Sequence, residues 1–379
     1  MSRRTLLLAL GAGLVVWLAL PTLGAARFLS QLTGQPDWLQ PWLANATVAV
    51  EDIDVPTRTG AIGARAYRPD GTARRTLVVV PGIHAGGVEE PRLDALARRL
   101  ASTGSIVISL PLPDLRQFLI TPASTDQIED AVAWVSRQPS LAPAGRVALV
   151  GVSFGGGLAV VAAGRPAIRD RLSTVVSIGG HGDLPRVLRF LCTGAIDDGQ
   201  TMAPHDYGVA VLLLAAADKV APPEQAAALA DGVREFLVAS SIHATDAARA
   251  AGMLADVTAR ADRMDEPSRS LLRAVLARDV AALGPALLPW VDELGGDPSL
   301  SPERSAPPSA PVFLLHGTTD NVIPPTETPR LAQHLERAGA PNVRALISPA
   351  VTHADIRTGI GVGDGWALIR FWRDLLAAG

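Results

Sequence analysis

Short apolar runs that alternate with helical segments constrain the fold of this chain more than any other feature of its sequence. Four such runs occur in the first half: TLVVV (76–80), SIVISL (105–110), RVALV (146–150) and STVVSI (173–178). Runs of this length are typical of strands that are buried on both faces. Segments with helical periodicity follow the first three runs, and strands that alternate with helices form parallel sheets covered on both sides. The pattern predicts a doubly wound α/β domain.

A hairpin precedes this alternation and a helical insertion interrupts it. Residues 46–69 alternate like a β-hairpin. Residues 181–308 are rich in Ala, Leu and Arg and predict helices. Two strands and two helices then follow in alternation: VFLLH (312–316), PRLAQHLERAG (329–339), VRALIS (343–348) and GWALIRFWRDLLAA (365–378). We therefore predict one α/β core built from residues 46–180 and 309–379, with the insertion between its two parts.

An uncharged stretch at the N-terminus predicts a targeting or membrane segment. Residues 5–26 follow MSRR without a single charge, and as a helix they would be roughly 33 Å long, about the thickness of a bilayer core. We predict that residues 1–26 are a signal anchor, or a signal peptide that ends at the small residues Gly24 and Ala26. A Trp-rich linker at 27–45 suits a membrane interface. The expected product is a single-pass membrane protein with an exported domain, or a secreted or periplasmic protein; a buried N-terminal core helix is the alternative.

The charge and the cysteine content exclude several classes of partner and cofactor. The formal net charge is −3 and Lys219 is the only lysine, so the sequence has no basic pattern for binding nucleic acid. Cys192 is the only cysteine, which rules out an intramolecular disulfide and a cysteine metal cluster. The sequence also has no HExxH motif. We therefore predict neither a metal nor a cofactor.

The segment GVSFGGG (151–157) places a serine in a G-x-S-x-G motif. The apolar run 146–150 leads directly into it, and the Ala-rich segment LAVVAAG leads out. A sharp turn between a strand and a helix exposes a serine hydroxyl above the sheet. Glycines are needed there because a side chain would collide with the neighbouring strand or helix. We predict that Ser153 is a nucleophile; a tight turn with an incidental serine is the alternative.

With this motif in place, the chain resembles the serine α/β-hydrolase family over residues 46–379. Four segments carry the resemblance, in the family's order of serine, acid and histidine: PGIHAGG (81–87), GVSFGGG (151–157), HGTTDNVIP (316–324) and SPAVTHAD (348–355). The resemblance implies an α/β-hydrolase fold, with a mostly parallel doubly wound sheet and a helical cap inserted before the acid-bearing strand. It also implies an esterase-like or lipase-like serine hydrolase that forms an acyl-enzyme.

His353 is the expected catalytic base. A serine hydroxyl is a poor nucleophile at neutral pH and needs a base within hydrogen-bond reach. The chain has seven histidines, of which His353 lies just after the predicted strand 343–348 and before the last helix. The family that the chain resembles carries its catalytic histidine at this place. A loop histidine without a role is the alternative.

Two similar turns compete to supply the acid. ADKVAPP and TDNVIPP each place an aspartate four residues before a pair of prolines, which makes Asp218 and Asp320 candidates. In the family the acid follows the strand immediately before the one that leads to the histidine, and Asp320 follows the run VFLLH. Residues 208–217, which precede Asp218, have an Ala and Leu content that favours a helix. We expect Asp320 to orient the imidazole, with Asp218, Asp355 and Asp183 as alternatives.

The resemblance also implies an oxyanion hole made of two backbone N–H groups. One belongs to the residue after the nucleophile, which is Phe154. The other comes from the loop 81–87, where this chain reads Pro-Gly-Ile-His and departs from the His-Gly-Gly-Gly of lipase-like members. Alignment assigns the second N–H to Ile83, with His84 as an alternative donor.

Residues 181–308 occupy the position of the family's helical cap, which often shapes the acyl and alcohol pockets. His181 and Asp183 lie just past the carboxyl end of a predicted strand, where ligands bind in α/β sheets. We expect a substrate-pocket role for one of them, with helix capping as the alternative. The apolar cap favours a small-molecule or lipid-like ester as substrate. The alternatives are a peptidase, a thioesterase or a perhydrolase with the same triad, and a non-catalytic envelope scaffold with this fold.

Overall fold

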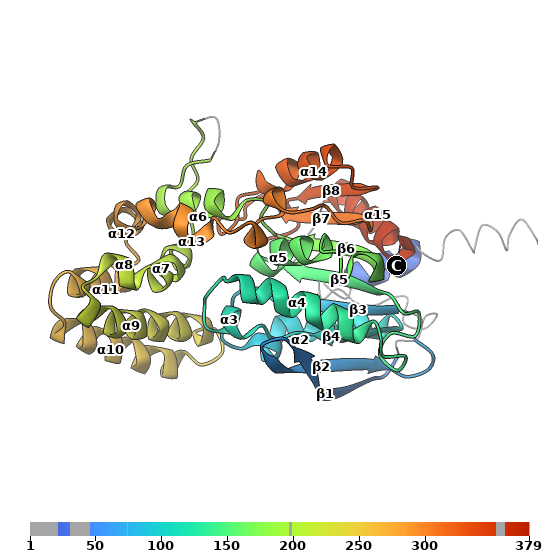
Figure 1. The fold of residues 1–379 in the computed structure, drawn as a ribbon, viewed down its shortest axis with the longest axis horizontal. Coiled ribbons are helices and arrows are strands. Elements are labelled where there is room, and N and C mark those ends of the chain that lie inside the picture. Colours follow the sequence, from blue (N-terminus) through green and yellow to red (C-terminus); the bar gives the residue numbers. More distant parts are fainter. Residues whose placement is uncertain (1–21, 31–45, 74, 197–198, 354–360, 379) are drawn as a thin grey trace, which may run out of the picture.

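An eight-stranded sheet in the order β1-β2-β4-β3-β5-β6-β7-β8 runs through the centre of the computed structural model (Figure 1). The strands are β1 (Val48–Thr57), β2 (Gly60–Pro69), β3 (Arg75–Val80), β4 (Ser105–Ser109), β5 (Val147–Val152), β6 (Leu172–Ile178), β7 (Val312–Gly317) and β8 (Val343–Ser348). β2 pairs antiparallel with β1 and β4, and the other neighbours are parallel. The structure describes residues 22–30, 46–73, 75–196, 199–353 and 361–378. The mostly parallel sheet predicted from the sequence is confirmed.

The four apolar runs of the sequence form the interior strands β3 to β6. Side chains alternate between the two faces of a strand. In β3, Val78 and Val80 therefore join the core on one face, whereas Leu77 and Val79 join the core on the other. The predicted hairpin is the pair β1 and β2, which forms the antiparallel edge of the sheet.

Two layers of helices cover the sheet. One layer contains α4 (Pro122–Val135), α5 (Phe154–Ala163) and α14 (Glu327–Arg337), and the other contains α2 (Pro91–Ser102), α15 (Val362–Ala378) and the helical segment 22–30. The short elements are η1 (Gly87–Glu89), α3 (Pro113–Arg116) and η2 (Arg169–Arg171). α2 has clear start signals, because Pro91 occupies its first turn and the Glu90 carboxylate accepts the Leu93 N–H at 2.7 Å.

The insertion between β6 and β7 is helical and forms a lobe beside the sheet, at the left of Figure 1. Its elements are α6 (Leu184–Thr193), α7 (Asp206–Ala215), α8 (Ala217–Val220), α9 (Pro223–Ile242), α10 (Ala247–Arg263), α11 (Ser268–Leu276), α12 (Val280–Leu287), η4 (Leu288–Trp290), α13 (Val291–Gly295), η5 (Pro298–Leu300) and η6 (Pro302–Arg304). α7 covers most of residues 208–217, so the prediction of a helix there is confirmed. Pro223 starts α9, where its missing N–H costs no hydrogen bond.

Residues 22–30 form a helix that packs against the core. Its Phe28 is buried and meets the Trp372 ring of α15 edge-on, with ring centroids 4.8 Å apart. This helix crosses the predicted boundary between the leader, 1–26, and the Trp-rich linker. The rest of both segments lies outside the described residues. Of the helices that the structure describes, none is long and apolar enough to cross a membrane.

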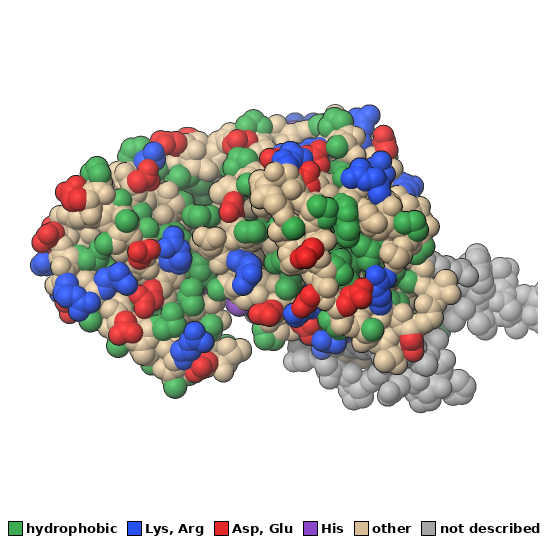
Figure 2. Space-filling view, turned by 60° about the horizontal axis from the view of Figure 1, so that its bottom comes forward, with side chains coloured by type: hydrophobic (Ala, Val, Ile, Leu, Met, Phe, Trp, Pro, Cys, Tyr) green, Lys and Arg blue, Asp and Glu red, His purple; other side chains and the backbone are tan. Residues whose placement is uncertain are grey.

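Acidic and basic side chains are interspersed on the face of the molecule shown in Figure 2. The structure also has exposed ion pairs: Arg273 lies 2.8 Å from Asp262. Exposed pairs of this kind contribute about 0–1 kcal/mol each. The mixed charges are therefore a solvated surface, and the buried polar groups described next are more informative about function.

Candidate active site

Ser153 stands on a strained turn between β5 and α5. Its backbone has φ 55° and ψ −133°, a conformation that residues other than glycine rarely adopt and that costs about 1–3 kcal/mol. Neighbouring glycines make the turn possible. A Cβ added to Gly155 would lie 2.2 Å from the Pro81 carbonyl oxygen, and one added to Gly151 would lie 2.3 Å from the Gly155 oxygen. The turn holds the serine at the carboxyl edge of the sheet.

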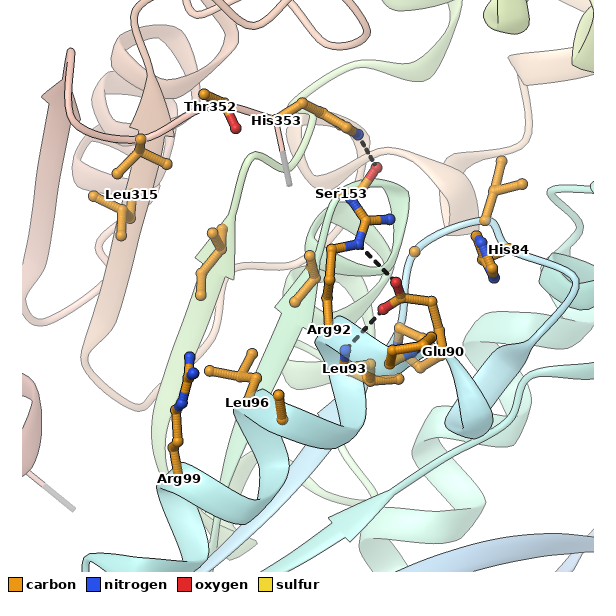
Figure 3. Close-up of a pocket in the computed structure, with 18 of the residues that line it drawn as sticks. His84, Glu90, Arg92, Leu93, Leu96, Arg99, Ser153, Leu315, Thr352 and His353 are labelled. Atoms are coloured by element: carbon orange, nitrogen blue, oxygen red, sulfur yellow. Dashed lines mark hydrogen bonds and ion pairs between the residues drawn. The ribbon is translucent and has the colours of Figure 1, made fainter. Parts of the chain in front are cut away.

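The structure brings Ser153, His353 and Asp320 together in a hydrogen-bonded chain. The distance between Ser153 Oγ and His353 Nε2 is 2.9 Å (Figure 3). The distance between His353 Nδ1 and Asp320 Oδ2 is 2.7 Å. Asp320 follows β7 and His353 follows β8. Because these strands are parallel neighbours, their loops leave the sheet at the same edge as the serine turn.

The Asp320 carboxylate is buried and accepts several hydrogen bonds. Its Oδ1 accepts the backbone N–H groups of Val322 at 2.9 Å and Ile323 at 3.0 Å. Its Oδ2 contacts His353 and, at 3.2 Å, Nε2 of His316. Burial alone would raise the pKa of Asp320, but the hydrogen bonds from His316 and His353 outweigh it and hold the pKa well below its usual range. Asp320 is therefore an anion at neutral pH.

His316 is a member of this group that the sequence interpretation missed. It ends β7, four residues before Asp320, and is fully buried. Its Nε2 lies 2.9 Å from the Ile323 carbonyl oxygen, so this nitrogen carries the proton, and its Nδ1 lies 2.8 Å from the Thr328 hydroxyl and accepts from it. The only signal in the sequence is the His-Gly dipeptide that opens HGTTD. His316 is a second donor to the carboxylate and holds the turn that carries it.

The protonation of His353 follows from its partners. An ionised carboxylate only accepts hydrogen bonds, so His353 Nδ1 carries the proton that Asp320 Oδ2 accepts. Its Nε2 is then an acceptor and faces the Ser153 hydroxyl. A neutral imidazole in this tautomer can take the serine proton and return it later, which is general acid–base chemistry.

Two backbone N–H groups flank the serine. Phe154 is the first residue of α5, and the first N–H groups of a helix have no partner within it. The loop after β3 lies against the serine turn, because a Cβ added to Gly82 would be 2.9 Å from Ser153 Cβ. Ile83 follows directly. Among the described residues, neither the Phe154 N–H nor the Ile83 N–H donates a hydrogen bond to another group.

His84, the alternative donor, faces the same space but is engaged by its own loop. Its Nδ1 accepts the Gly86 N–H at 3.1 Å. Burial lowers the pKa of His84, while the nearby Glu90 carboxylate acts in the opposite direction. His84 is therefore a neutral imidazole beside the serine turn at neutral pH.

A cavity of about 510 Å³ adjoins Ser153 (Figure 3). Its walls come from the loop after β3, from α2, from the ends of β5, β6 and β7 and from residues 351–353. The described residues that line it include none from 181–308. Helix α2 and the sheet occupy most of its walls, and the expectation that the cap shapes the substrate pocket stays a prediction.

His181 and Asp183 also differ from their expected place in the pocket, since neither lines this cavity. His181 is buried under α5, with Nε2 2.8 Å from the Leu300 carbonyl oxygen. Asp183 caps α6 by accepting the Arg186 N–H at 2.9 Å, and its other oxygen pairs with Arg304 at 2.6 Å. Asp183 therefore has the helix-capping role that was the alternative, whereas His181 is packed between α5 and the Leu300 carbonyl.

The other candidates for the acid lie away from His353 or outside the described residues. Asp218 is in α8, where its exposed carboxylate lies 3.5 Å from Lys219. Asp183 is used in the cap junction, and Asp355 is outside the described residues. Within the described part of the chain, no group of three His, Cys, Asp or Glu side chains could hold a metal ion.

Comparisons with known proteins agree with this architecture. A family model described as the alpha/beta hydrolase fold matches residues 75–356. An esterase from Pyrobaculum calidifontis aligns with a TM-score of 0.50 at 22% identity, over 90% of each chain. Brefeldin A esterase, a bacterial homologue of human hormone-sensitive lipase, aligns with a TM-score of 0.46 at 18% identity, over 95% of this chain and 82% of its own. No curated protein matches the sequence. At 22% identity and a TM-score of 0.50, the likeness to the Pyrobaculum esterase shows the fold alone.

Proposed function

Because the family model matches most of its length, this chain belongs to the alpha/beta hydrolase fold family, and we propose that it hydrolyses carboxylic esters through an acyl-enzyme on Ser153. One observation carries the proposal. The contacts of 2.9 Å between Ser153 Oγ and His353 Nε2 and of 2.7 Å between His353 Nδ1 and Asp320 Oδ2 lie at the wall of a cavity that can admit a substrate.

Acylation begins when Ser153 Oγ attacks the ester carbonyl carbon and His353 Nε2 takes the hydroxyl proton. The carbonyl π-electrons move to oxygen, and the Phe154 and Ile83 N–H groups are the proposed donors to that anion, at roughly 3 kcal/mol for each donor. The intermediate then collapses. His353 gives its proton to the departing alkoxide, and the alcohol leaves an acyl group on Ser153.

Deacylation repeats these steps with water as the nucleophile. His353 Nε2 takes a proton from water as its oxygen attacks the acyl carbon, and then returns a proton to Ser153 Oγ as the carboxylic acid leaves. The Asp320 carboxylate stabilises the imidazolium in both halves without becoming protonated. Its depressed pKa suits this role.

Active-site labelling tests the proposal. We expect a fluorophosphonate probe to label Ser153 and the protein to hydrolyse p-nitrophenyl butyrate. Ser153→Ala should abolish labelling and lower turnover by about 10³-fold or more. Ser140→Ala, which changes an exposed serine, is the matched control. A folded wild-type protein that is neither labelled nor active would overturn the proposal.

The same protein distinguishes ester hydrolysis from the other reactions that this arrangement supports. Butyryl groups can be offered as the p-nitrophenyl ester, as a thioester and as a p-nitroanilide. We expect the highest kcat/KM for the ester. A higher value for the anilide or the thioester would assign the chain to peptidases or thioesterases instead.

We also propose, from the sequence of residues 1–26, that the hydrolase domain is exported. The uncharged run after Arg3 and Arg4 supports this proposal. A fusion of residues 1–45 to a reporter that is active only outside the cytoplasm should be active. An inactive fusion, or a reporter retained in the cytoplasm, would contradict export.

A further inference from the structure

The two faces of the sheet are packed to different extents. On the face toward α4 and α5, Val78, Leu149 and Val175 are fully buried. On the face toward α2 and α15, Leu77 and Ala148 are only partly buried, although they lie on interior strands. Interior parallel strands with helices on both faces are ordinarily buried. The second face therefore borders an open space inside the fold.

Two cavities occupy this space. The first is the 510 Å³ cavity at Ser153, and the second, of about 290 Å³, lies further along the same face of the sheet. Leu96 of α2, Ile178 of β6 and Trp372 of α15 line both cavities. The two are therefore neighbours with these three side chains at their boundary, and we refer to them together as the joined cavity. Figure 3 shows how the first cavity extends from Ser153 past Arg92 to Leu96 and Arg99 of α2.

The floor of the joined cavity is formed by two adjacent strands. Its residues, in order from the serine edge, are Val152, Val150 and Ala148 on β5 and Ile178, Val176 and Thr174 on β6. The residues are two apart on each strand, so they share one face of the sheet. The floor is therefore continuous from the first cavity to the end of the second.

Helix α2 supplies a wall along the same direction. Leu96, Leu100 and Thr103 are four and three residues apart, which places them on one stripe of the helix. Four residues separate Ile178 from Thr174, a length of about 13 Å along the strand. With C–C bonds of about 1.5 Å, an extended hydrocarbon of this length has roughly ten methylenes.

The middle of the joined cavity is hydrocarbon. Val150, Val176 and Leu100 line it together with Leu375 and Leu376 of α15. At the far end, Arg75 and Arg146 stand at the start of β3 and before β5, and there the apolar walls end. A narrow apolar cavity of this length accommodates a linear chain, because each methylene moved from water to an apolar wall gains free energy.

We propose that the joined cavity holds the unbranched acyl chain of an ester substrate, with roughly ten to fourteen carbons; this assignment rests on the proposed ester hydrolysis at Ser153. The acyl group stays on Ser153 while the alcohol departs. A cavity between the sheet, α2 and α15 suits the group that stays. The loop side of the first cavity, at His84 and Gly87, leaves a path for the alcohol.

Two bulky substitutions at different depths test the proposal. Leu96→Trp narrows the junction of the cavities, and Ala148→Phe fills only the second. The readout is kcat/KM for p-nitrophenyl butyrate, octanoate, dodecanoate and palmitate, each divided by the value for butyrate. We expect wild type to prefer dodecanoate to butyrate. Leu96→Trp should lower the ratios for octanoate and longer chains by about tenfold or more, and Ala148→Phe only those for the longer chains.

Ala49→Phe adds the same side chain on exposed β1 and should leave every ratio as in wild type. Circular dichroism checks the fold of each variant. If Ala148→Phe does not fold, Leu96→Trp on helix α2 still tests the proposal. Unchanged ratios in both folded variants would overturn it. The same two variants can be assayed with acetate esters of long alcohols. If they lower kcat/KM for these esters but not for esters of long acyl chains, the acyl assignment is overturned.

Binding of dodecanoate to Ser153→Ala, measured by calorimetry, separates this proposal from the proposed activity. We expect binding that Leu96→Trp, added to the same protein, weakens about tenfold. If wild type hydrolyses no ester but this binding is observed, the proposed reaction fails and the hydrocarbon site stands. If butyrate is hydrolysed but dodecanoate neither binds nor reacts, the cavity assignment fails and the reaction stands.

Discussion

The turns ADKVAPP and TDNVIPP have the same spacing of aspartate, valine and prolines but opposite environments. Asp218 lies in α8 between two cap helices, exposed and 3.5 Å from Lys219. Asp320 follows β7, is buried, and receives two backbone N–H groups and two histidine contacts. The same local pattern thus forms a solvated ion pair in one place and a buried hydrogen-bond acceptor in the other.

The residues just before each aspartate explain the difference. His316 and Gly317 precede Asp320 where Leu214 and Ala215 precede Asp218. Leu214 is packed in the apolar core of the cap, whereas His316 contacts the Asp320 carboxylate. A Cβ at Gly317 would lie 2.3 Å from the Val351 carbonyl oxygen. Only the turn with glycine can approach the segment that carries His353.

The largest effect is expected when each aspartate is replaced by asparagine. Asp320→Asn should lower kcat for p-nitrophenyl butyrate by roughly 10³–10⁴-fold, because the amide neither stabilises the imidazolium nor holds the same tautomer. Asp218→Asn is the matched control and should leave kcat unchanged. Loss of turnover in Asp218→Asn with retention in Asp320→Asn would reverse the comparison.

A smaller effect is expected from Gly317→Ala. The added methyl group has to displace the Val351 carbonyl, and His353 lies two residues further on. A shift of about 1 Å in a catalytic group can cost about 10²-fold in rate, so we expect a loss of that order in kcat. Ala215→Gly in α7 should lower the free energy of unfolding by about 0.5–1 kcal/mol without changing kcat. Equal kcat values for Gly317→Ala and wild type would show that the close approach is not needed.

The smallest effect concerns stability at low pH. The pKa of Asp320 is lower in the folded protein than its value of about 3.9 in an unfolded chain. Its ionised form therefore stabilises the fold above about pH 4, and this stabilisation is lost as the pH falls toward the folded pKa. Urea denaturation at about pH 6 and pH 3 should show a decrease in the free energy of unfolding that is smaller by about 1 kcal/mol in Asp320→Asn than in wild type. Asp218→Asn should show the same decrease in the free energy of unfolding as wild type, because it keeps Asp320. Equal decreases in wild type, Asp320→Asn and Asp218→Asn would contradict the prediction.

The sequence predicts the fold well where the signal is local. The interior strands follow from unbroken apolar runs, the serine turn follows from its glycines, and the helix at Asp206–Ala215 follows from Ala and Leu content. His316 was missed because its only local signal, the His-Gly dipeptide, does not tell which group the imidazole contacts. His181 and Asp183 do not line the cavity at Ser153, because the sequence does not tell on which side of the sheet a cavity lies.

Residue patterns alone therefore determined the order of strands and helices, the strained turn at Ser153 and the division into a sheet and a helical lobe. These depend on the periodicity of apolar residues and on the backbone freedom of glycine, which act over a few neighbours. The tertiary structure decided which aspartate meets His353, because that depends on β7 and β8 being parallel neighbours. It also decided that the cavity at Ser153 and its neighbour lie on the face of the sheet toward α2 and α15. That placement depends on how α2 and α15, more than two hundred residues apart in the sequence, pack over the same strands.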